Sequence, residues 1–128
     1  MAVRIVRLGT PREKGEGLRI GTVRRPPRGV AKERFAADDW YDVWYPNLSP
    51  SVATLKIGQE AATPQQWKIF VSKYRAEMSS PDNTRTIELL ALLSHTADFS
   101  VGCYCEDESH CHRSVLRMLL AERGAKFA

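Results

Sequence analysis

The spacing of apolar residues alternates along the chain between a strand-like and a helix-like period, and this alternation limits the fold more than any other feature. Short apolar runs with β-branched residues predict strands over residues 2–8, 18–23 and 98–104. Longer segments with an apolar stripe predict helices over residues 64–78, 84–95 and 112–123. This order predicts an α/β fold: a single compact domain over residues 1–128, with a small parallel or mixed sheet flanked by helices.

Local capping signals mark the ends of two of these helices. Thr63 is a good N-cap, Pro64 suits the first turn, and Gln66 completes a capping box. Gly124 stands at the position that commonly ends a helix, directly after the last apolar stripe. The helix over 84–95 is apolar around most of its circumference, which predicts that it is well buried.

Composition excludes several classes of protein. The chain has 128 residues, of which 43% are hydrophobic and 27% are charged, as expected of one globular domain with its own core. No apolar run approaches the length that spans a bilayer, so no membrane association is expected. The N-terminal segment lacks the apolar stretch of a signal peptide. We therefore expect a cytoplasmic location.

Positive charge is concentrated near the N-terminus. Residues 1–34 contain ten Lys or Arg and three Glu, whereas the remaining residues contain nine Lys or Arg and twelve Asp or Glu. Arg24 and Arg28 follow the predicted strand over 18–23, on a loop stiffened by prolines. Ligands of open α/β sheets bind at the carboxyl ends of strands, and guanidinium groups bind phosphate or carboxylate through paired hydrogen bonds. Both arginines are therefore candidate ligands for a small anion.

Aromatic residues are concentrated shortly after this loop. They are Phe35, Trp40, Tyr41, Trp44 and Tyr45. Core packing is the simpler role for them, and a stacking surface for bases is the alternative. Together with the basic N-terminal region, the alternative makes a nucleic-acid-binding module a further hypothesis. The segment over 46–62 has no clear period and predicts a loop with a short helix.

All three cysteines and two of the three histidines lie within ten consecutive residues. One interpretation is structural, because cysteine is a small residue that is often buried. A second is a zinc or iron site with Cys103, Cys105, Cys111 and His110 as ligands; the adjacent Cys111 and His112 are expected to have difficulty reaching one ion together. A third is a disulfide between Cys105 and Cys111, which a cytosolic chain keeps reduced unless it is redox-active.

A fourth interpretation of this segment is an anion site with a nucleophile. The segment leads into the N-terminus of the last predicted helix, where free N–H groups favour an anion and Arg113 adds a positive charge. Cys105 or Cys111 is the candidate nucleophile, because a helix terminus and a nearby arginine lower a thiol pKa. His112 is the candidate for proton transfer. The acidic residues after Cys105 argue against the phosphate-binding loop of cysteine phosphatases.

The segment from Arg24 to Glu33 reads R-x-x-P-R-G-V-x-K-E, and it resembles a segment of the domain-of-unknown-function 488 family. Weaker similarities to the same family are Asp39-Trp40, Pro50-Ser51, the helix that contains Trp67, and Cys111-His112-Arg113. Two positions depart from the family pattern: Val23 stands where aspartate is usual, and Pro26 where tryptophan is usual. The resemblance covers nearly the whole chain. It implies a compact α/β fold and a small cytosolic protein of bacterial type.

These observations combine into one hypothesis about a site. If the strands over 18–23 and 98–104 are parallel neighbours, the arginine loop and the cysteine-histidine segment face the same end of the sheet. We then expect one pocket in which Arg24, Arg28 and Arg113 hold a small phosphate-bearing or nucleotide-like anion, and any chemistry falls to the thiols and His112. The alternatives are a metal-binding or thiol-redox protein that uses the cysteines, and the nucleic-acid-binding module.

Overall fold

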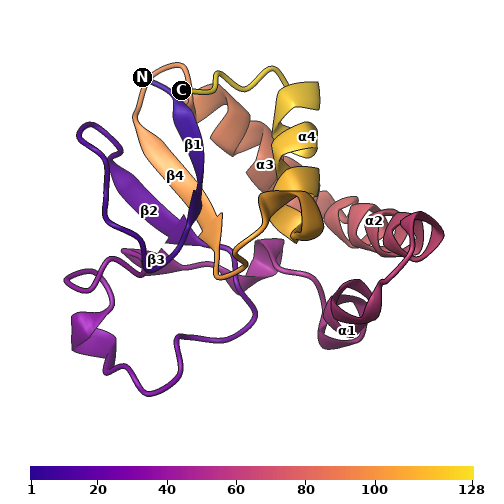
Figure 1. Ribbon diagram of the computed structural model, residues 1–128. Coiled ribbons are helices and arrows are strands. Elements are labelled where there is room, and N and C mark those ends of the chain that lie inside the picture. The colour runs from indigo at the N-terminus through magenta and orange to yellow at the C-terminus, as the bar shows by residue number, and fades with distance from the viewer.

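Four strands form one sheet in the order β1-β4-β2-β3 (Figure 1). The structure is a computed structural model that describes all 128 residues. The strands are β1 (Val3–Arg7), β2 (Leu18–Gly21), β3 (Val43–Trp44) and β4 (Phe99–Cys103). Every pairing is parallel, so the predicted α/β fold is confirmed and the sheet is purely parallel. β4 lies between β1 and β2, and all five of its residues are buried.

The helices lie to one side of the sheet (Figure 1). They are α1 (Val52–Glu60), α2 (Pro64–Met78), α3 (Pro81–Leu93) and α4 (His112–Glu122). The main core forms between α2, α3, α4 and the sheet, where Tyr74, Leu90 and Leu116 pack with Val3 and Val101. Three short 3₁₀ turns lie at Lys32–Arg34, Pro46–Leu48 and Glu108–His110. No helix has both the length and the apolar character needed to cross a bilayer.

The capping signals are confirmed. The Thr63 hydroxyl accepts a hydrogen bond from the Gln66 backbone N–H at 3.2 Å, and the Gln66 side chain accepts one from the Thr63 N–H at 3.2 Å. These reciprocal bonds satisfy two N–H groups that have no partner within the helix, and α2 therefore begins at Pro64. After α4 the chain turns through Gly124 with φ at 82°, which is a conformation that glycine adopts without strain.

Helix α3 differs from its prediction at both ends and in its burial, and it ends at Leu93, two residues before the predicted end at residue 95. It begins three residues earlier, at Pro81, because the Ser80 hydroxyl caps it by accepting the Asn83 N–H at 3.3 Å. It is also only half buried, since it packs through Ile87, Leu90 and Ala91. The other face is open, with Leu89 56% and Leu92 71% exposed. The prediction of a well-buried helix was wrong because nothing in this chain covers its second apolar side.

Helix α1 occupies about half of residues 46–62, for which the sequence predicted a loop with a short helix. Its N-terminus is fixed by a residue far away in the sequence, Glu77 of α2. The Glu77 carboxylate accepts hydrogen bonds from the Ser51 N–H at 2.8 Å, the Ser51 hydroxyl at 2.7 Å and the Thr54 hydroxyl at 2.7 Å. Burial alone would raise the pKa of Glu77, but these bonds outweigh it and lower the pKa. This contact between helices is not visible in the local apolar pattern.

Loops cover the face of the sheet opposite the helices, and a buried ion pair holds them there. Arg19 of β2 donates to both Glu16 carboxylate oxygens, at 2.7 and 3.0 Å. Its remaining nitrogen donates to the backbone carbonyls of Thr10, at 2.9 Å, and Asp39, at 2.7 Å. Glu16 also accepts from the Ser100 hydroxyl of β4 at 2.9 Å. The pair therefore ties two loops to the middle of the sheet.

The two edges of the sheet are short or covered. At one edge β3 has only two residues. At the other edge the last residues of the chain run parallel to the start of β1, where the Val3 N–H donates to the Lys126 carbonyl at 2.9 Å and the Ala128 N–H donates to the Val3 carbonyl at 3.0 Å.

Candidate functional site

The segments that follow β2 and β4 meet at one end of the sheet. The two strands are parallel neighbours, with Gly21 opposite Gly102. Beyond the paired residues, Thr22 donates from both its N–H and its hydroxyl to the Gly102 carbonyl, each at 3.0 Å. The arginine loop and the cysteine-histidine segment therefore leave the sheet side by side, which confirms the arrangement expected from the sequence.

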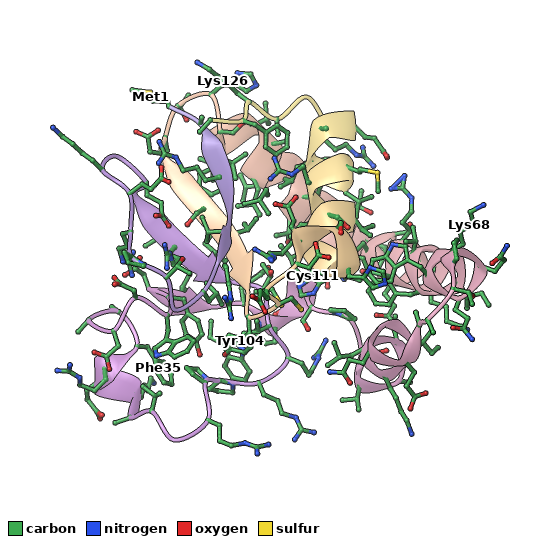
Figure 2. The ribbon with its side chains drawn as sticks, viewed as in Figure 1. Met1, Phe35, Lys68, Tyr104, Cys111 and Lys126 are labelled. Atoms are coloured by element: carbon green, nitrogen blue, oxygen red, sulfur yellow. The ribbon has the colours of Figure 1, made fainter.

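Three thiols and one imidazole gather where these segments meet. The Cys103 and Cys105 sulfurs are 3.8 Å apart, and the Cys111 sulfur is 3.8 Å from His112 Nδ1. The sulfurs of Cys103 and Cys111 and a ring nitrogen of His112 all lie within 4.8 Å of one another. All three cysteines are free. Figure 2 shows Cys111 at the start of α4 and Tyr104 just beyond β4, at the same end of the sheet.

The backbone before α4 explains how two adjacent residues contribute to one cluster. Cys111 is the N-cap residue, with φ at −135° and ψ at 151°, and His112 is the first residue of the helix. The change from extended to helical backbone turns both side chains toward the end of β4. The expectation that adjacent residues Cys111 and His112 have difficulty reaching one point was therefore wrong.

The His112 ring is buried and has a fixed orientation. Its Nε2 lies 2.7 Å from the Thr22 carbonyl oxygen. Because a carbonyl can only accept, Nε2 is protonated and donates a hydrogen bond to it. The other nitrogen, Nδ1, faces the Cys111 sulfur at 3.8 Å, and in the neutral imidazole it carries a lone pair. The edge of the Tyr74 ring packs against the imidazole, with ring centroids 5.6 Å apart.

The three thiols of this cluster differ in pKa. Hydrogen bonds from Cys103 and Cys105, with a further contribution from His112, lower the pKa of Cys111 far below that of an ordinary thiol. The same contacts with Cys105 and Cys111, together with burial, raise the pKa of Cys103. For Cys105 the Cys103 thiol lowers the pKa, but Cys111 and burial outweigh it and the pKa is raised. Cys111 is therefore the thiol that ionises first.

A pocket of about 810 Å³ opens over this cluster. Its lining includes Cys103, Cys105 and His112, together with the aromatic residues Trp40 and Tyr104. The lining also contains four arginines: Arg7, Arg24, Arg25 and Arg28. It contains no aspartate or glutamate, so the positive potential of the arginines is not compensated within the pocket.

Sequence comparison assigns the chain that forms this site to a family. A family model with the description "Active DUF488-N3 subclade" matches residues 3–124, from the first residue of β1 to just past the end of α4. The chain belongs to the DUF488 family. No curated protein and no solved structure matches it. The match extends over both segments that form the pocket, and it confirms the resemblance noted in the sequence.

In this DUF488 protein the predicted anion ligands have three different environments. Arg28 is exposed at the pocket rim. Arg24 also lines the pocket, but two of its nitrogens donate to the carbonyls of Pro50 and Ser49, each at 3.0 Å. Arg113 lies outside the lining; it is buried, and its Nη2 donates to the Cys105 carbonyl at 2.6 Å. Arg113 therefore positions the loop of Cys105 and does not face the pocket.

The two histidines of the cysteine-histidine segment also lie in different environments. His112 joins the thiols, whereas His110 is exposed and packs on the Trp67 ring, with centroids 4.7 Å apart. The structure thus groups Cys103 and Cys111 with His112 in place of the predicted His110.

Two pocket residues of this DUF488 protein, Arg7 and Tyr104, were not predicted from the sequence. Arg7 ends β1, and its Nε donates to the Tyr104 carbonyl at 3.3 Å. The Trp40 and Tyr104 rings pack edge to face at 5.8 Å, and the Tyr104 hydroxyl donates to the Arg25 carbonyl at 2.8 Å. The position of Arg7 at the carboxyl end of a predicted strand was the one available signal, because it matches the position of Arg24.

Proposed function

We propose that the protein binds a small phosphate-bearing, nucleotide-like anion in the pocket between the arginine loop and the cysteine-histidine segment. The observation that carries this proposal is the lining itself, with four arginines and no carboxylate. Guanidinium groups bind phosphate through paired hydrogen bonds, and they bind more strongly where no acidic side chain competes.

The arginines differ in how rigidly they are held. Arg24 is fixed by the two carbonyls that it contacts, and its Nη1 makes no hydrogen bond to the protein. Arg25 and Arg28 are exposed and form no ion pair. This arrangement suits an anion that first meets the exposed side chains of Arg25 and Arg28 and is then oriented by Arg24.

The size and the aromatic wall of the pocket favour a nucleotide over a bare phosphate. Pockets for small ligands have volumes of about 300–1,000 Å³, and this pocket has about 810 Å³. Trp40 and Tyr104 provide the aromatic surface against which a base packs. A ligand held in this way would place its polar groups near His112 and the thiols. Cys105, the half-buried thiol of the lining, and His112 are the groups that would take part in any reaction, with Cys111 behind them.

The test is a calorimetric titration with inorganic phosphate and with nucleoside mono- and diphosphates. We expect a nucleotide to bind and Arg28→Ala to weaken its binding by about 10- to 150-fold, because a charge-assisted hydrogen bond contributes roughly 1.5–3 kcal/mol and about 1.4 kcal/mol is tenfold in affinity. Arg85→Ala is the matched control, since Arg85 is exposed on α3 outside the pocket. Equal binding by the Arg28→Ala and Arg85→Ala variants would contradict the proposal.

The same titration distinguishes the proposed nucleotide pocket from the alternative of a nucleic-acid-binding module. A module of that kind binds long polymers much better than mononucleotides and loses affinity steeply with salt. Tight binding to a single-stranded oligonucleotide together with no binding to any mononucleotide would replace the proposal with the alternative.

A further inference from the structure

The thiol-imidazole cluster contains more ligating atoms than an anion pocket requires. Cys103, Cys111 and His112 are all buried, and their ligating atoms lie within 4.8 Å of one another. The Cys105 sulfur adjoins them, at 3.8 Å from the Cys103 sulfur. Three cysteines that serve only as small core residues have no reason to direct their sulfurs and an imidazole lone pair at one point.

Two of the distances in this cluster are close to those of a tetrahedral zinc site, and the three buried ligating atoms all lie within 4.8 Å of one another. Zn–S bonds of about 2.3 Å place two sulfur ligands about 3.8 Å apart at tetrahedral angles, and a sulfur and a nitrogen ligand slightly closer. The Cys103 and Cys105 sulfurs are 3.8 Å apart, and Cys111 Sγ and His112 Nδ1 are also 3.8 Å apart.

The surroundings of His112 are those of a metal ligand. A histidine that binds a metal through one nitrogen commonly donates the proton on the other nitrogen to a carboxylate or a backbone carbonyl, which fixes its tautomer. Here Nε2 contacts the Thr22 carbonyl at 2.7 Å. Nδ1 faces the Cys111 sulfur at 3.8 Å, on the side where a metal would bind.

The surrounding charge also suits a thiolate-rich site. Arg113 is 3% exposed, and its Nε has no hydrogen-bond partner. Its Nη2 contacts the carbonyl of Cys105, which places a buried positive charge beside the thiols. No carboxylate approaches from the pocket.

We propose that Cys103, Cys111 and His112 bind one Zn²⁺ ion, with its fourth coordination position on the pocket side, where Cys105 lies. Cys111, which ionises first, binds as the thiolate that it already is. The S–H bond of Cys103 is replaced by a Zn–S bond, and its proton is released to solvent with no change in oxidation state. The ligands are two thiolates and one neutral imidazole. This inference stands on the cluster geometry and does not depend on the anion ligand of the pocket.

The first experiment uses the wild-type protein, reduced and freed of metal by a chelator that is then removed. One equivalent of Co²⁺, which substitutes for Zn²⁺, is expected to produce the strong visible bands of a tetrahedral site and a thiolate-to-cobalt band in the near ultraviolet. Zn²⁺ is expected to abolish these bands at one equivalent and to acidify an unbuffered solution. Absence of the tetrahedral thiolate spectrum in this folded wild-type protein would overturn the proposal.

The variants compare neighbouring residues of the same type. We expect His112→Gln and Cys111→Ser to weaken Zn²⁺ binding by more than about 100-fold, since loss of even an outer-shell partner costs about 10–100-fold. His110→Gln is the matched control and is expected to bind Zn²⁺ as the wild type does, because His110 contacts Trp67. Cys105→Ser is expected to retain cobalt with shifted visible bands. Circular dichroism of the metal-free variants checks their folding. A folded His112→Gln variant with the wild-type spectrum would also overturn the proposal.

The proposals of a metal site and of an anion pocket can be contradicted independently of each other. Arg28→Ala is expected to keep the cobalt spectrum unchanged while it weakens nucleotide binding. An anion that binds a protein without a metal site would support only the pocket, and a protein that takes up zinc but no anion would support only the metal site.

Discussion

Two regions of this molecule use arginine in opposite ways. On the loop-covered face of the sheet, Arg19 is 1% exposed and all of its donor nitrogens contact Glu16 or backbone carbonyls. At the carboxyl end of the sheet, Arg25 and Arg28 face a pocket that has no carboxylate. Arg19 has a structural role, because all of its hydrogen-bond donors are already used within the protein. Arg25 and Arg28 have donors that remain available to bind a ligand.

The largest effect expected from this comparison is on stability. Arg19→Ala leaves Glu16 as a buried charge without its partner, and removal of one member of a buried pair costs about 3–5 kcal/mol. We expect the free energy of unfolding, measured by urea denaturation, to fall by this amount. A loss below about 1 kcal/mol would mean that the loops over this face are held by other contacts.

The pH dependence of stability tests the same pair with a smaller effect. Burial would raise the pKa of Glu16, but the hydrogen bond from Arg19 and those from Ser100 and the backbone outweigh it and lower the pKa. A carboxyl whose pKa is lowered by folding stabilises the protein above its unfolded pKa, about 4.3, and this contribution is lost as the pH falls toward the folded pKa. We expect Glu16→Gln to flatten the fall in unfolding free energy below about pH 4.3. Glu60→Gln, an exposed control on α1, is expected to leave the slope unchanged.

At the other region, Thr22 joins the two segments that form the site. Its hydroxyl donates to the Gly102 carbonyl at 3.0 Å and lies 3.4 Å from His112 Nε2. We expect Thr22→Val to lower the free energy of unfolding by about 1–2 kcal/mol, because a buried hydrogen bond is lost. Thr96→Val, at an exposed position, is the control in the same urea experiment. Equal stability of the two variants would show that the backbone alone joins the segments.

The smallest change in stability is expected for a substitution of Arg28 at the rim of the pocket. Arg28 is exposed and has no partner, so Arg28→Ala is expected to change the free energy of unfolding by less than about 0.5 kcal/mol. The same variant is expected to lose nucleotide affinity. A large loss of stability in this variant would remove the contrast with Arg19.

The sequence predicts the elements of this fold well where local signals determine them. The capping box at Thr63 marked the start of α2, and the β-branched runs marked three of the four strands. Two features depend on contacts between distant residues. The N-cap residue of α1, Ser51, is held by the Glu77 carboxylate of α2, and the second apolar side of α3 is left exposed at Leu92. Neither feature changes the local apolar period on which the prediction rests.

The candidate site shows the same limit. The parallel pairing of β2 and β4 follows from rules about α/β folds, so the meeting of the two loops was predictable. The choice of His112 over His110 was not, because it depends on the backbone change at Cys111 and on the Thr22 carbonyl. The inward turn of Arg113 likewise depends on the position of the Cys105 carbonyl. Spacing along the chain carries no information about these contacts.

The short and covered edges of the sheet have a consequence for the behaviour of the protein at high concentration. Open strand edges are templates on which other chains add strands and aggregate. Here β3 offers only two residues, and the Lys126–Ala128 segment occupies the start of the opposite edge. A substitution that detaches this segment, such as Phe127→Asp, is therefore expected to promote association between chains through β1.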